Sequence, residues 1–170
     1  MKVYLLPQDP ENMHARKLIA LLTSSLGAHG ITVASSPTTL IGRLIAWLRQ
    51  LWIGDLCIAI GFGQSHVARN HGTIAIHQDG DDYSRAVAKS IAEATADTLG
   101  TQLRGNMRCG FKSDRAESFG DLRKSYRPAI KHNVLLMVCY QTNESNMHAY
   151  HSGTAGLVAE LTAVIKYWVE

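Results

Sequence analysis

Cysteine and proline are scarce in this sequence of 170 residues, and their scarcity excludes several kinds of protein. The three cysteines, Cys57, Cys109 and Cys139, are odd in number and widely spaced, which argues against a disulfide framework and against a cysteine zinc site. The four prolines are scattered, and no proline-, glycine- or serine-rich linker divides the chain. We therefore expect one domain over residues 1–170, large enough to bury its own hydrophobic core.

An excess of charge of one sign and a long hydrophobic run are also missing. Lysine and arginine number 17 against 14 acidic residues, and this net charge of +3 is too weak to predict a nucleic-acid partner. The most apolar stretch, 40–62, is interrupted by Arg43, Arg49 and Asp55, so we expect no membrane span and no membrane partner. The apolar run before Pro7 is too short for a secretory signal, which predicts a cytoplasmic protein.

Apolar runs and helical spacings alternate along the chain. The expected strands are Lys2–Leu6, Ile31–Ala34, Asp55–Ile60, Thr73–His77 and Val134–Tyr140. The expected helices are a segment that begins with Asp9 as its N-cap and ends between Gly27 and Gly30, then Thr39–Trp52, Asp82–Leu99 and Thr154–Val169; residues 100–131 are expected to be mostly loop. This order predicts an α/β sandwich, a mostly parallel central sheet with helices on both faces.

In such a sheet, ligands bind beyond the carboxyl ends of the strands. The residues that follow the expected strands are therefore the candidate ligand contacts. Those singled out are Glu11, Gly61, Gln64, His77 and Asn143. The Gly61–Ser65 turn is rich in glycine and suits backbone N–H donation to an anion. His77 ends a strand and is the histidine expected to face the pocket, whereas the others, including the isolated pair in His148-x-x-His151, are expected mainly at the surface.

A basic loop is expected to cross the same edge of the sheet. Its arginines are Arg104, Arg108, Arg115 and Arg123, and its acidic residues are Asp114, Glu117 and Asp121. Guanidinium groups hold carboxylates and phosphates through charge-assisted hydrogen bonds. We therefore expect a small anionic ligand as the partner, with a merely solvated basic loop as the alternative.

Several short motifs occur in a distinctive order. Residues 54–61 read GDLCIAIG, Gly72-Thr73-Ile74 follows, Arg104-Gly105 comes after the next helix, Leu122-Arg123 precedes the last strand, and residues 132–143 read HNVLLMVCYQTN. Over nearly the whole chain this order resembles the zinc-dependent N-acetylmuramoyl-L-alanine amidases of the type 3, cell-wall hydrolase family. Arg104 and Arg123 stand at family-like positions, and this favours them among the arginines as ligand contacts.

The resemblance implies a zinc-binding histidine in the first loop, a second after the middle strand and a catalytic glutamate in the last strand. Here these positions hold Gln8 or Asp9, Gly61 and Met137, and only Glu11 matches a residue of the family's site. A hydrolytic zinc ion needs three protein ligands and an open position for water. We therefore expect no zinc, no other cofactor and no catalytic residue, and we count Met137 among the residues that line the ligand site.

These expectations favour a catalytically degenerate amidase-fold protein that binds or sequesters a small ligand, either an anionic nucleotide-like molecule or a cell-wall glycopeptide. A compact single domain of this kind is also compatible with a phage protein. One alternative is an active N-acetylmuramoyl-L-alanine amidase or another metal hydrolase with substituted ligands, which requires Asp9, Glu11 and His77 to converge. The other is a structural protein that forms homo-oligomers through apolar helix faces.

Overall fold

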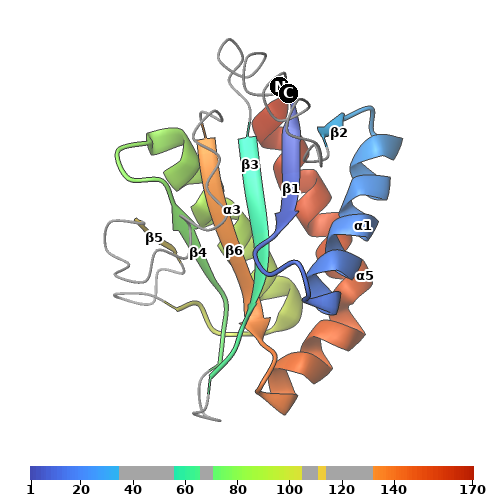
Figure 1. The fold of residues 1–170 in the computed structure, drawn as a ribbon, viewed down its shortest axis with the longest axis vertical. Helices are drawn as coiled ribbons and strands as arrows, with labels where there is room; N and C mark the ends of the chain where they lie inside the picture. The colour runs from blue at the N-terminus through green and yellow to red at the C-terminus, as the bar shows by residue number, and fades with distance from the viewer. Residues whose placement is uncertain (35–55, 66–70, 105–110, 114–131) are drawn as a thin grey trace.

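A computed structural model describes residues 1–34, 56–65, 71–104, 111–113 and 132–170 (Figure 1). Its described strands form one six-stranded sheet in the order β2-β1-β3-β6-β4-β5. The strands are β1 (Val3–Pro7), β2 (Val33–Ala34), β3 (Leu56–Gly63), β4 (Ile74–His77), β5 (Phe111–Ser113) and β6 (His132–Tyr140). The described helices are α1 (Met13–Ala28), α3 (Asp82–Leu99) and α5 (Glu144–Val169). The predicted α/β architecture is confirmed.

The sheet is mostly parallel, but one strand pair reverses direction. β1 pairs in parallel with β2 and β3, β3 with β6, and β4 with β5. β4 runs antiparallel to β6, with Ile74 opposite Met137 and His77 opposite Val134 (Figure 1). The carboxyl ends of β1, β3 and β6 therefore share one edge of the sheet, which we call the carboxyl edge, and the amino end of β4 lies on that side.

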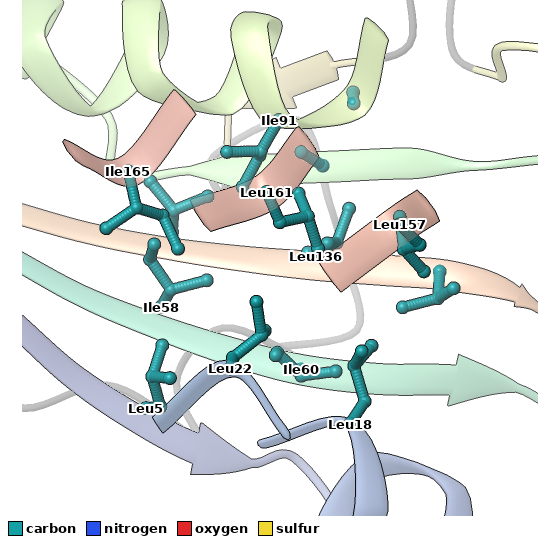
Figure 2. Close-up of a cluster of buried hydrophobic side chains, with 14 of the residues drawn as sticks. Leu5, Leu18, Leu22, Ile58, Ile60, Ile91, Leu136, Leu157, Leu161 and Ile165 are labelled. Atoms are coloured by element: carbon teal, nitrogen blue, oxygen red, sulfur yellow. The ribbon is translucent and has the colours of Figure 1, made fainter. Parts of the chain in front are cut away.

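The main hydrophobic core lies between the sheet and the three described helices. Side chains that alternate along β3 and β6, such as Ile58, Ile60 and Leu136, meet Leu18 of α1 and Leu161 of α5 (Figure 2). All five side chains are almost fully buried. Burying a large aliphatic side chain contributes about 1.5–3 kcal/mol, so this layer fixes the positions of the strand ends.

The opposite face of the sheet is apolar as well. Tyr4, Leu6 and Cys57 form one buried cluster there, and Ala59, Ile76 and Leu135 form another with the partly buried Met137 against it. Strands with apolar residues on both faces are typical of a sheet covered on both sides. The helix expected at Thr39–Trp52 lies outside the described residues.

Two helices begin elsewhere than the sequence suggests. Asn12, rather than Asp9, caps α1, since its side chain accepts a hydrogen bond of 3.0 Å from the Ala15 N–H. Asp9 instead forms a turn by accepting the Glu11 N–H at 3.0 Å. Both residue types cap helices well, so composition does not choose between them.

α5 begins at Glu144, ten residues earlier than expected, because Asn143 caps it through the Asn146 N–H. The polar first turns of this helix hide its apolar spacing. β5 lies within the segment 100–131, which the sequence predicts to be mostly loop. α3 has the expected bounds. In the described part of the chain, no helix has both the length and the hydrophobicity of a membrane span.

Candidate functional site at the carboxyl edge

Three residues that are far apart in the sequence meet at the carboxyl edge, and we call them the Gly61 cluster. Gly61 of β3 lies opposite Met137 of β6, and the Gln8 N–H donates to the carbonyl oxygen of Ile60 at 2.8 Å. A Cβ atom at Gly61 would meet the Gln8 amide oxygen and would lie 2.8 Å from the Met137 sulfur. The neighbouring side chains therefore occupy the space that any larger residue at position 61 would need.

The Gly61 cluster does not fit a zinc ion. Its side-chain groups are a neutral amide and a thioether, whereas protein zinc sites use imidazole, thiolate and carboxylate ligands. Among the residues that the structure describes, no three His, Cys, Asp or Glu side chains are grouped so that they could hold a metal. We therefore derive no step through zinc, and the expected absence of a cofactor stays a prediction.

Arg104 and Tyr140 form a second group at this edge, the Arg104–Tyr140 pair. Arg104 Nη1 donates to the Tyr140 hydroxyl, and the guanidinium carbon lies 4.8 Å from the centre of the tyrosine ring. The Arg104 N–H also donates to the Thr73 carbonyl at 2.8 Å. Because Thr73 precedes the antiparallel β4, this bond brings Arg104 to the carboxyl edge.

Glycines make room for the Arg104–Tyr140 pair. A Cβ at Gly63 would lie 2.8 Å from the Tyr140 ring, and one at Gly72 would lie 2.9 Å from Arg104 Cγ. Gly72 also has a φ of 100°, a backbone conformation that L side chains rarely adopt. The arginine is thus held at both its backbone and its side chain.

Three further predicted contacts lie in the loops of the same edge. Glu11 is exposed in the turn after β1. Gln64 is exposed beside Ser65, whose N–H donates to Thr142 Oγ1 at 3.2 Å. Asn143 has a structural task as the N-cap of α5. The structure therefore brings six predicted contacts to the carboxyl edge: Glu11, Gly61, Gln64, Arg104, Met137 and Asn143. Arg123 lies outside the described residues.

His77 is the predicted contact that the fold places elsewhere. It lies opposite Val134, near the amino end of β6, because β4 runs antiparallel to β6. The expectation that it follows a strand into the shared pocket assumed a parallel β4, and it is wrong. Asp9 and Glu11 adjoin each other in their turn, whereas His77 lies near the amino end of β6, so the convergence of Asp9, Glu11 and His77 that the enzyme alternative was expected to require does not occur.

Some residues at the carboxyl edge were not singled out from the sequence. Asn12 Nδ2 donates to Gln141 Oε1 at 3.0 Å, which ties the start of α1 to the end of β6. Asn146 is buried and accepts from the Gly72 N–H at 3.1 Å and the Tyr140 N–H at 3.3 Å. Tyr140 was visible as the last residue of an apolar run, but the arginine that binds it is 36 residues away in sequence.

The opposite edge carries a partly buried polar group centred on Asp81. Its carboxylate accepts from Ser84 Oγ and lies 2.8 Å from His132 Nδ1, and it also accepts the Tyr83 N–H. Burial raises the pKa of Asp81, but the hydrogen bonds from Ser84 and His132 outweigh this effect and leave the pKa below its ordinary value. This group joins the start of α3 to the start of β6 and lies away from the Gly61 cluster.

The described cysteines have no role in the candidate site. Cys57 and Cys139 are buried, and neither is part of a disulfide bond. Burial raises the pKa of Cys139 to about 12. A thiol of this kind stays protonated at neutral pH and is a poor nucleophile.

Comparison with solved structures identifies the fold. A Neisseria meningitidis protein assigned as an N-acetylmuramoyl-L-alanine amidase is 17% identical, with a TM-score of 0.68 over 96% of this chain and 92% of its own. The catalytic domain of the amidase CwlV from Bacillus (Paenibacillus) polymyxa is 17% identical, with a TM-score of 0.69 over 99% and 98% of the two chains. No family model matches the chain, and no curated protein matches it significantly in sequence.

A third match is the Clostridioides difficile amidase CwlD, solved in complex with the lipoprotein GerS. It is 11% identical, with a TM-score of 0.68 over 99% of this chain and 98% of its own. These matches contradict the expectation of a degenerate protein that sequesters a small ligand, because they favour the amidase alternative and none of them indicates a sequestering protein. The chain has the fold of the N-acetylmuramoyl-L-alanine amidases.

Proposed function

We propose that this protein is an N-acetylmuramoyl-L-alanine amidase that hydrolyses the amide bond between the muramoyl group and L-alanine in peptidoglycan. The observation that carries the proposal is the fold, which the solved amidases share over 96–99% of this chain. A likeness over the full length of the domain, rather than over one motif, supports a shared site at the carboxyl edge, where sheets of this class bind their ligands.

The Arg104–Tyr140 pair is proposed to bind the peptide part of the substrate. A peptide stem carries carboxylates, and a guanidinium binds a carboxylate through two parallel hydrogen bonds. The Tyr140 hydroxyl and ring hold the Arg104 side chain in place, so little further ordering is needed when a substrate binds. The role of this pair is binding and orientation.

Amide hydrolysis also needs a group that accepts the proton of the attacking water. Asp9 and Glu11 are the carboxylates of the turn that follows β1, and both are exposed. We propose that this turn supplies the proton acceptor. The assignment is to the turn rather than to one residue, because the two carboxylates adjoin each other.

Digestion of purified peptidoglycan tests the proposal. The protein is incubated with insoluble sacculi, with added zinc in one arm and with a chelator in another, and newly exposed alanine amino groups are quantified. We expect their release by the wild type and a loss of about 100-fold or more in the Asp9→Asn/Glu11→Gln double variant. Asp97→Asn/Glu160→Gln, which changes two exposed carboxylates elsewhere, is the matched control. Release in no arm overturns the proposal, and equal release by the double variant overturns the role of the turn.

A further inference from the structure

We propose that the side-chain amide of Gln141 donates a hydrogen bond to the carbonyl oxygen of the scissile amide, an inference that rests on the proposed function and adds a residue to its site. Gln141 directly follows β6 at the carboxyl edge, and its side chain is half-buried. Its backbone N–H donates to the Gly63 carbonyl at 2.9 Å, which fixes the residue against the end of β3. A polar side chain thus lies at the strand ends, where sheets of this class bind their ligands.

Two hydrogen bonds determine which way the Gln141 amide faces. The backbone N–H of Ala15 can only donate, so the Asn12 atom that accepts it at 3.0 Å is the amide oxygen. The other end of Asn12 is therefore its NH2 group, and the Gln141 atom that this group binds at 3.0 Å is the oxygen. The oxygen of Gln141 is thus occupied, whereas its NH2 group binds no other group in the described part of the chain.

The Gln141 amide lies between the two groups that the proposed function assigns to the substrate. Asn12, which holds Gln141, directly follows Glu11 in the turn proposed to accept the proton of water. Tyr140, which precedes Gln141, binds Arg104, the proposed partner of a peptide carboxylate. A substrate that is held by Arg104 and attacked by water beside Glu11 therefore has its scissile amide next to Gln141.

A donor at this place acts on the charge that forms during hydrolysis. The water oxygen bonds to the carbonyl carbon, one water proton passes to a carboxylate of the turn, and the carbonyl oxygen becomes negatively charged. The C–N bond then breaks, the carboxylate returns that proton to the alanine nitrogen, and a carboxyl group and a free amine leave. The hydrogen bond from Gln141 strengthens as the oxygen gains charge, so it should raise kcat more than it raises affinity.

Steady-state hydrolysis of a soluble N-acetylmuramoyl-peptide tests the inference with two variants. Gln141→Glu keeps an oxygen for Asn12 but has no N–H donor, and Gln141→Met removes the donor without adding charge. Both should lower kcat by about 100-fold with little change in KM. Ser145→Glu adds the same charge in the exposed first turn of α5 and should keep the kcat of the wild type.

NMR of the Gln141 NH2 group gives a readout that needs no turnover. In the ¹⁵N-labelled Asp9→Asn/Glu11→Gln variant, the NH2 signals that Gln141→Met removes should shift when the N-acetylmuramoyl-peptide is added. An unchanged kcat in both Gln141 variants, a loss in Gln141→Glu alone, which would be an effect of charge, or the absence of a shift overturns the inference and leaves the hydrolysis by the wild type standing. No hydrolysis by the wild type overturns the proposed function, and this inference with it.

Discussion

Gly61 and Met137 face each other across β3 and β6, and the methionine sulfur lies 2.8 Å from the place where a Cβ at position 61 would stand. The Gln8 amide closes the same space. A side chain at position 61 would therefore displace the ends of the Gln8 and Met137 side chains.

Gly61→Ala should lower the free energy of unfolding by about 1 kcal/mol or less, because the added methyl meets only the ends of the flexible Gln8 and Met137 side chains, which can move aside. Gly27→Ala is the matched control, since nothing lies within 4 Å of a Cβ at this helical position and the change should stabilise α1 by about 0.5–1 kcal/mol. Urea unfolding measures both changes. In a Met137→Ala background the penalty at position 61 should shrink; full additivity of the two substitutions would show that they do not share this space.

Arg104→Ala should weaken the binding of a carboxylate-bearing muropeptide by about ten- to a hundred-fold, the loss of a charge-assisted contact. Tyr140→Phe keeps the ring beneath the guanidinium but removes the hydroxyl, so its effect should be smaller. Calorimetry with an inactive variant, such as the Asp9/Glu11 double variant, measures binding without turnover. A muropeptide whose carboxylates are amidated should bind with equal affinity to the inactive variant with Arg104 and to the same variant carrying Arg104→Ala. An unchanged affinity of Arg104→Ala for the free acid would exclude the arginine from the site.

Asp81 should make stability depend on pH in the acid range. Its folded-state pKa is lowered, so its contribution is complete above the ordinary value of 3.8 and is lost as the pH falls through the lower folded value. Asp81→Asn should therefore cost about 1–2 kcal/mol at pH 7 and at pH 5, with the difference shrinking below 3.8. Asp97→Asn, an exposed change on the same helix, should stay within about 0.5 kcal/mol of the wild type. A difference for Asp81→Asn that does not vary down to the acid transition would contradict this role.

The fold was largely predictable because its strands are continuous apolar runs and its helices alternate with them. The bounds of α3 follow from Asp81, a capping residue, and Gly100, which takes the left-handed conformation at the other end. The direction of β4 was not predictable in the same way. A short apolar strand has the same local pattern whether it runs parallel or antiparallel, and the placement of His77 depends on that direction.

The candidate site was predictable where it depends on strand ends and less so where it depends on contacts between distant loops. Gly61 and Met137 each end or line a strand, so their meeting follows from the parallel pairing of β3 with β6. The hydrogen bond between Arg104 and Tyr140 depends on the antiparallel direction of β4. Because of that direction Thr73, just before β4, lies at the carboxyl edge, and the Arg104 N–H binds its carbonyl there.

The most direct test of the proposed function is mass spectrometry of a single soluble N-acetylmuramoyl-peptide incubated with the purified protein. Hydrolysis of the muramoyl–alanine bond adds one water and divides the molecule into the free sugar acid and a peptide with an alanine amino terminus. We predict both products, at a rate proportional to protein concentration and strongly reduced in Asp9→Asn/Glu11→Gln. Recovery of the intact N-acetylmuramoyl-peptide at every protein concentration, with and without added zinc, would contradict the assignment of this protein as an amidase.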